Sequence, residues 1–119
     1  MSEMKLGVVE SQFADIIWEN EPIPSSQLAK LAEQKLSWKK STTYTVLRRL
    51  CDRGLFQNCD GAVTSLVSKD EFLALRSESF VNDEFEGSLP AFLAAFGKRK
   101  KLSDKEIDEL QEIIDGMRG

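Results

Sequence analysis

The amino-acid sequence predicts a mainly α-helical chain in which three helices and a short β-hairpin precede a second helical region. Apolar residues recur every three or four positions along most of the chain, as they do on one face of an amphipathic helix. An Asp-Gly pair at positions 60–61 lies between two short β-type runs, which is typical of a hairpin turn. Two serines, each followed three residues later by glutamate, mark helix starts in the second half.

The first two helices are separated by a break that contains two prolines. A helix is expected over residues 8–19, followed by Pro22 and Pro24, which disfavour helix in the residues before them. Ser25 is a suitable N-cap for a second helix over residues 26–35. The apolar stripes of the two helices consist of Val9, Phe13, Ile16, Ile17 and Trp18 in the first and Leu28, Leu31 and Ala32 in the second.

A third helix is expected over about residues 40–53, ended by Gly54, and its outer face is unusual. Its inner face carries Thr43, Val46, Leu47 and Leu50. The rest of its surface consists of Lys40, Ser41, Thr42, Tyr44, Thr45, Arg48 and Arg49. Hydroxyl-bearing and β-branched residues are poorer helix formers than the Glu, Lys and Ala that are common on helix surfaces. The choice of residues on this face therefore indicates a requirement other than helix formation.

Two short strands are expected at residues 55–57 and 62–67, on either side of the Asp-Gly turn. Three helices followed by a hairpin is the order of elements in a winged helix, a variant of the helix-turn-helix. We therefore expect a winged helix-turn-helix domain over residues 1–67.

The remaining residues, 68–119, are predicted to form an α-helical dimerisation region. Helices are expected over about residues 69–83, 88–96 and 104–117, with Gly97 and the basic run 98–101 separating the last two. Three short helices have too little mass to form a globule of their own. Their apolar stripes must pack on the first domain or on a second copy of the chain in a two-fold dimer, and we favour the dimer. The candidate interface residues are Phe72, Leu75, Phe80, Leu89, Phe92, Leu93, Phe96, Ile107, Leu110, Ile113 and Ile114.

Composition favours a binding protein over an enzyme. The chain has no His, which excludes His-based catalytic triads and most zinc sites. Its two cysteines, Cys51 and Cys59, fit neither a disulfide framework nor a CxxC pair, and no glycine-rich phosphate loop is present. We expect no enzymatic activity, no cofactor and no metal. Since neither a signal peptide nor a membrane-spanning run is visible, a cytoplasmic location is expected.

The distribution of charge points to nucleic acid, although the net charge is −4. Residues 30–53 hold seven basic and two acidic residues; from charge alone, a solvated helix face explains this stretch equally well. Short hydroxyl side chains near the start of the third helix can read base edges, and cations along it can contact phosphates, so the combination favours DNA. The candidate DNA-binding residues are Lys39, Lys40, Ser41, Thr42, Tyr44, Thr45, Arg48, Arg49 and Arg53.

Backbone N–H groups near Ser25 and Ser26, at the start of the second helix, are candidates for a further phosphate contact. The alternative from a different class is a winged-helix adaptor that binds proteins and does not bind DNA. The net charge fits that alternative, and so does a hairpin that lacks Lys and Arg between residues 54 and 66.

These residues give the chain a resemblance to the penicillinase-repressor family, the BlaI/MecI/CopY type. The resemblance covers nearly the whole sequence, and its most specific part is the spacing of Trp38, Thr42, Thr45, Arg49 and Gly54. Other matching runs are Ile17-Trp-Glu19, Arg53-Gly-Leu55, Leu66-Val-Ser68, Phe85-Glu-Gly-Ser88 and Leu102-Ser-Asp-Lys-Glu-Ile107.

The resemblance implies a homodimeric transcriptional repressor that binds a palindromic double-stranded DNA operator. Its recognition helix, about residues 40–53, would lie in the major groove, and its tail would form the dimer. By matching positions, the residues that would meet DNA are Ser41, Thr42, Tyr44, Thr45 and Arg49. In this family, repression is relieved by an upstream membrane sensor protease that leads to cleavage of the repressor in its tail, or, in copper-responsive members, by metal.

Three departures from the family pattern limit what the resemblance implies. The hairpin segment is about four residues short and has no Lys or Arg, so wing contacts to DNA are not expected. The paired CxC motifs of copper-responsive members are absent, so control by metal is not expected. Ala95 and Phe96 stand where cleaved members have Asn-Phe before an acidic linker, and the linker here is basic, so the usual cleavage is not expected.

Overall fold

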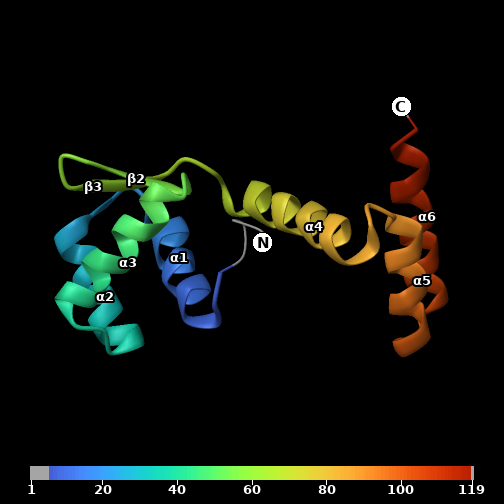
Figure 1. Cartoon of the computed structure of the whole chain (residues 1–119), viewed down its shortest axis with the longest axis horizontal. Helices are drawn as coiled ribbons and strands as arrows, with labels where there is room; N and C mark the ends of the chain where they lie inside the picture. The colour runs from blue at the N-terminus through green and yellow to red at the C-terminus, as the bar shows by residue number, and fades with distance from the viewer. Residues whose placement is uncertain (1–5, 119) are drawn as a thin grey trace. The chain divides into compact units, whose positions relative to one another are not determined.

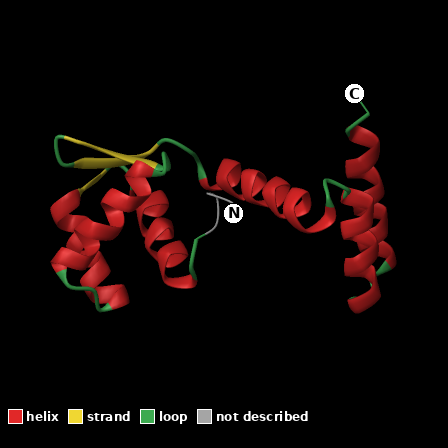
Figure 2. Ribbon diagram, in the orientation of Figure 1, coloured by secondary structure: helices red, strands yellow, loops and turns green. Residues whose placement is uncertain are grey.

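The computed structural model describes residues 6–118 and confirms a mainly helical chain with a small antiparallel sheet (Figures 1 and 2). The elements, in chain order, are α1 (Val8–Asn20), β1 (Ile23–Pro24), α2 (Ser25–Leu36), α3 (Lys40–Asp52), β2 (Phe56–Cys59), β3 (Ala62–Ser65), α4 (Lys69–Phe85), α5 (Leu89–Arg99) and α6 (Asp104–Gly116). Three helices and a hairpin followed by further helices is the predicted winged-helix order.

The chain divides into two compact units, and the division falls inside α4. The N-terminal unit ends at Ser79 and the C-terminal unit begins at Phe80. The first turns of α4 therefore belong with the winged helix and its last turns with α5 and α6.

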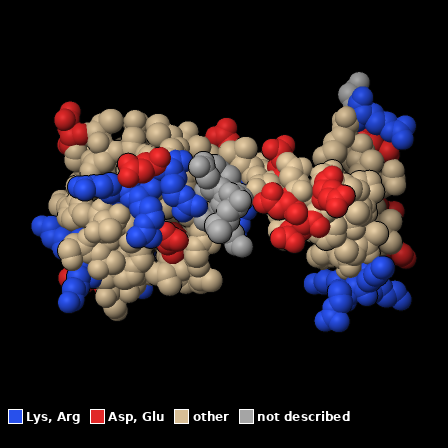
Figure 3. Space-filling model, in the orientation of Figure 1, with Lys and Arg blue, Asp and Glu red and all other residues tan. Residues whose placement is uncertain are grey.

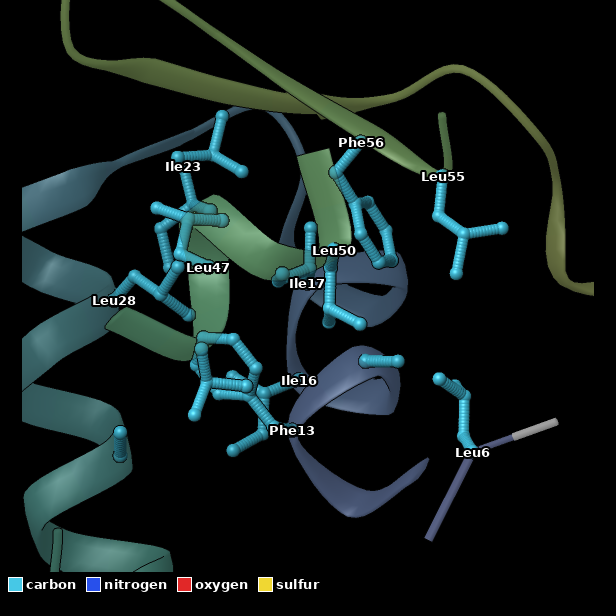
Figure 4. Packing of buried hydrophobic residues seen from close by; sticks show 14 of the residues in the cluster. Leu6, Phe13, Ile16, Ile17, Ile23, Leu28, Leu47, Leu50, Leu55 and Phe56 are labelled. Atoms are coloured by element: carbon cyan, nitrogen blue, oxygen red, sulfur yellow. The ribbon is translucent and has the colours of Figure 1, made fainter. Parts of the chain in front are cut away.

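The N-terminal unit is built around one apolar core, to which α1, α2, α3 and the sheet all contribute (Figure 4). The largest fully buried side chains include Phe13 and Ile17 of α1 and Leu50 of α3. Both tryptophans pack against this core. The Trp38 ring lies 5.0 Å from the Phe13 ring, and the Trp18 ring lies 5.2 Å from the ring of Phe56.

The sheet has the strand order β1-β3-β2, with both pairs antiparallel. Asp60 and Gly61 have φ values of 53° and 86°, as the predicted tight hairpin turn requires. The sequence did not predict β1, a strand of two residues between the prolines, in which Ile23 lies opposite Val63 of β3. Strand β2 also begins and ends later than expected, at Phe56–Cys59.

Two predicted helix boundaries are wrong. Helix α2 has Pro24 as its N-cap, so Ser25 is its first helical residue and not its cap. Helix α5 continues through Gly97 to Arg99 and ends where Lys100 becomes extended, so the basic run does not lie wholly between helices. A single glycine weakens a helix by about 1 kcal/mol without breaking it.

The start of α4 is fixed to the N-terminal unit by three contacts. The Trp18 indole N–H donates to the backbone oxygen of Val67 at 2.9 Å, and Lys69 pairs with Asp15 at 2.9 Å. The Phe72 ring lies 5.6 Å from Trp18, and Phe72 is only 2% exposed. The assignment of Phe72 to the dimer interface is therefore wrong, because this side chain completes the core of its own unit.

The C-terminal unit consists of short, well-capped helices that cover one another only in part. Ser88 accepts a hydrogen bond from the N–H of Ala91, and Ser103 and Glu106 form the predicted capping box. The ring of Phe92 contacts the rings of Phe80 and Phe85 at 6.0 and 5.5 Å. No residue of α5 or α6 is buried.

Candidate nucleic-acid interface

Helix α3 is amphipathic, and its outer face carries the residues that the sequence singled out. Thr43, Val46, Leu47 and Leu50 are buried, as expected. Seven of the nine candidate DNA-binding residues are exposed, while Tyr44 and Arg53 are half-buried. Arg53 is the C-cap, and its backbone N–H donates to the backbone oxygen of Arg49 at 3.1 Å. The packing of α3 on the core therefore turns the hydroxyl and basic side chains to one outer surface.

The hydroxyl groups of α3 differ in what they already bind. The buried Thr43 donates to the backbone oxygen of Lys39 at 3.3 Å, which satisfies its hydroxyl inside the core. The exposed Thr45 donates to the backbone oxygen of Ser41 at 2.9 Å. A threonine whose hydroxyl donates to its own helix keeps the lone pairs of that oxygen and its methyl group available to a ligand.

The basic side chains of α3 gather on one face of the N-terminal unit, where Figure 3 shows Lys and Arg with acidic groups beside them. One such neighbour is Glu10 of α1: its carboxylate lies 3.4 Å from the Arg49 guanidinium. The sequence did not predict this pairing, since 39 positions separate the two residues. Within residues 6–118, Lys39, Lys40 and Arg48 form no ion pair.

The two strands of the hairpin carry polar side chains without Lys or Arg. Gln57 donates to the Thr64 hydroxyl across the two strands at 3.1 Å. The carboxylate of Glu21 accepts hydrogen bonds from both the backbone N–H and the hydroxyl of Ser65, at 2.8 Å each, and so holds the end of β3 against the unit. Glu21 was missed by the sequence analysis, because only the fold brings it to Ser65.

One of the two backbone N–H groups expected to contact a phosphate at the start of α2 is already hydrogen-bonded. The backbone N–H of Ser25 donates to the backbone oxygen of Gly61 at 2.7 Å, so the hairpin turn already uses it. The prediction for Ser25 is therefore wrong, and the reason is the pairing of β1 with β3, which the sequence did not reveal.

The C-terminal unit has a different candidate surface, an apolar groove of about 390 Å³ between α5 and α6. Its lining residues are Phe92, Leu93, Phe96, Leu102, Glu106, Glu109, Leu110 and Ile113. Five of the candidate dimer-interface residues, Phe92, Leu93, Phe96, Leu110 and Ile113, are among them. The other candidates apart from Phe72 are exposed: Leu75, Phe80, Leu89, Ile107 and Ile114.

The two cysteines are free thiols with different surroundings. Burial, together with the negative charge of Asp52, raises the pKa of the Cys51 thiol above its ordinary value, whereas Cys59 is exposed on the hairpin. Across residues 6–118 no cluster of three His, Cys, Asp or Glu side chains is placed to hold a metal ion. No helix in that range is long and apolar enough to cross a membrane.

Comparison with known proteins gives one consistent result. A family profile described as penicillinase repressor matches residues 6–116. The penicillinase repressor of Bacillus licheniformis is 27% identical over 110 residues, which cover 89% of this chain and 86% of that protein. The methicillin resistance regulatory protein MecI of Staphylococcus aureus (strain Mu50) is 24% identical over 114 residues, covering 92% of this chain and 93% of that protein. A penicillinase repressor of Staphylococcus aureus is 19% identical over 116 residues, covering 94% and 92%.

Proposed function

The chain belongs to the penicillinase repressor family and is a transcriptional repressor; from that premise we propose that it acts as a homodimer on a palindromic DNA operator. In this proposal α3 enters the major groove, and the C-terminal units of two chains pair. Because a two-fold dimer presents two copies of α3, its operator contains two inverted half-sites.

The observation that carries the DNA proposal is the outer face of α3. Its N-terminal half offers the hydroxyls of Ser41, Thr42 and Thr45, which suit hydrogen bonds to base edges and contacts with thymine methyl groups. Exposed cations lie on either side of these hydroxyls along the helix, Lys39 and Lys40 at its start and Arg48 and Arg49 in its second half, where they can contact phosphates. The hydroxyl groups and the cations lie on a single face of α3 because the opposite face packs on the core.

The dimer proposal is supported by the apolar surface of the C-terminal unit. Ile107, Ile113 and Ile114 of α6 are each more than two-fifths exposed, and Ile113 also lines the groove. Apolar residues that a single chain leaves this exposed are typical of an interface. Packing against the same surface of a second chain buries them symmetrically.

The test is a titration of the protein with its enriched palindromic duplex at several salt concentrations. Log affinity should fall steeply with log salt concentration, since cations are released from the phosphates. Arg49→Ala should weaken binding by about 1–3 kcal/mol if this side chain contacts a base. The control is Lys105→Ala, which removes one positive charge from an exposed position of α6. Equal affinity of the Arg49→Ala and unmodified proteins would contradict the assignment of Arg49.

Thr45 provides a separate test of base reading. Thr45→Ala should reduce the difference in affinity between the enriched and a scrambled duplex more than it reduces binding to the scrambled duplex. An equal loss on both duplexes would contradict the role of Thr45. The adaptor alternative predicts no measurable binding to either duplex in both experiments. A separate test distinguishes it: an adaptor would not be retained on heparin or bulk DNA at low salt, whereas the repressor would.

Relief of repression by an upstream membrane sensor protease would require a local change in helix α5. Ala95 and Phe96, which stand at the position of the family's cleavage pair, lie inside helix α5. A protease would have to unwind this part of α5 before it could cleave there, since protease active sites bind extended chains.

A further inference from the structure

Glu10 lies at a point where two structural features meet. It is in the first turn of α1, where its Oε1 accepts a hydrogen bond from the backbone N–H of Gly7 at 3.3 Å. Its Oε2 lies 3.4 Å from an Nη of Arg49 on α3. The carboxylate is therefore held at one oxygen by the end of α1 and faces a candidate DNA-binding cation with the other.

The geometry leaves most of the Arg49 guanidinium unused. A guanidinium has five N–H donors, and the contact with Glu10 engages one of them. The Arg49 side chain is 57% exposed and that of Glu10 25% exposed, so the arginine can reach a ligand while its neighbour stays partly covered. Arg49 can thus contact DNA with its outer donors and keep Glu10 behind it.

We infer that Glu10 determines specificity by restricting what Arg49 can bind. This inference rests on the proposed function, that is, on α3 reading an operator. When Arg49 reaches a base edge, the Glu10 carboxylate orients the guanidinium and remains paired. When Arg49 contacts a phosphate of unrelated DNA instead, the Glu10 carboxylate behind it repels that phosphate and offsets part of the positive charge of the guanidinium.

Glu10 changes the affinity for unrelated DNA and the affinity for the operator in opposite directions. Binding to unrelated DNA is almost wholly electrostatic, so a carboxylate at the surface weakens it. Base recognition gains when the arginine is held in a fixed orientation, since fewer side-chain conformations are lost on binding. Glu10 therefore widens the gap in affinity between the operator and unrelated DNA.

The test uses Glu10→Gln, which removes the charge but keeps an oxygen that can accept the hydrogen bond from Gly7. Glu33→Gln is the matched control, because Glu33 is an exposed residue of α2 and the change in net charge is the same. Each full-length protein is titrated with the duplex most enriched from a random-sequence pool and with a scrambled duplex of equal length and composition. The quantity compared is the dissociation constant for the scrambled duplex divided by the dissociation constant for the enriched duplex.

Glu10→Gln should lower this ratio about fivefold, the size expected for one exposed ion pair, mainly through tighter binding of the scrambled duplex. Glu33→Gln should leave the ratio unchanged. In an Arg49→Ala background, Glu10→Gln should no longer alter the ratio, whereas a merely structural role at the end of α1 would persist there.

Two results would overturn the inference while leaving the proposed function intact: an unchanged ratio in Glu10→Gln, or the same change in the Arg49→Ala background. Failure of the unmodified protein to distinguish the two duplexes would overturn the proposed function, and this inference with it.

Discussion

The two units of this chain differ in how far they bury their apolar side chains. In the N-terminal unit, three helices and a three-stranded sheet enclose a core in which Phe13, Ile17, Leu50 and Phe56 are at most 1% exposed. In the C-terminal unit, α5 and α6 are as clearly amphipathic, yet none of their residues is buried. Both units follow the same apolar periodicity, but only one of them closes a core within a single chain.

This difference separates two roles. A unit with its own core can display polar and charged side chains on an outer helix without endangering its stability, as α3 does. In the proposed dimer, a unit that leaves its apolar face open would gain stability by association, which would link its folding to its pairing. Each of the following changes should therefore affect one unit and spare the other.

The largest expected effect comes from emptying the core of the N-terminal unit. Phe13→Ala should lower the free energy of unfolding of this unit by about 3–5 kcal/mol, because it removes a buried ring and leaves a cavity beside Trp38. Tryptophan fluorescence during urea unfolding measures this unit alone, since both tryptophans lie in it. A loss below about 1 kcal/mol would contradict the described core.

A charge on the open face of α6 should break pairing and spare the core. Ile113 is 55% exposed and lines the groove, so Ile113→Glu should weaken dimerisation by about 2 kcal/mol, roughly thirtyfold, without shifting the fluorescence transition. Sedimentation equilibrium measures the dissociation constant. The control is Asp108→Asn, on the same helix but outside the groove. If Ile113→Glu and the unmodified protein dimerise equally, this face is not the interface.

A smaller effect is expected where α4 is fixed to the N-terminal unit. Trp18→Phe keeps an aromatic ring but removes the N–H that donates to Val67, and it should destabilise this unit by about 1 kcal/mol. Circular dichroism during thermal unfolding measures the change. Dimerisation should stay as it is. A dissociation constant that shifts together with the melting temperature would show that the two units are not independent in stability.

The smallest effect concerns thiol reactivity inside the N-terminal unit. Because the pKa of Cys51 is raised, it carries less thiolate at a given pH than a thiol of ordinary pKa, and packing on the core restricts access to it. Iodoacetamide should therefore modify Cys59 before Cys51, as peptide mass spectrometry would show. In urea the difference should disappear. Faster modification of Cys51 in the folded protein would contradict its placement.

The sequence predicted the helices and the hairpin well, because their signals are local. The stripe of α3, the turn at Asp60-Gly61 and the capping box at Ser103 each lie within a few residues. Strand β1 was missed, since two residues between prolines carry no alternation and their pairing with β3 depends on the fold. Phe72 was misassigned for the same reason: its partner Trp18 is distant along the chain.

The candidate site divides in the same way. Which residues face outward on α3 followed from helical periodicity, so the exposed cations and hydroxyls could be named beforehand. What those residues touch could not be named. The pairing of Arg49 with Glu10 and the use of the Ser25 N–H by Gly61 both depend on how separate elements pack.

The central claim, that paired chains read DNA with two copies of α3, is tested most directly by selecting bound duplexes from a random-sequence pool. Sequencing should reveal an inverted repeat whose half-site centres lie about 10 base pairs apart or a multiple of that, since each α3 enters the major groove on the same side of the duplex. Enrichment of no sequence, or of one half-site without its inverted mate, would contradict the account.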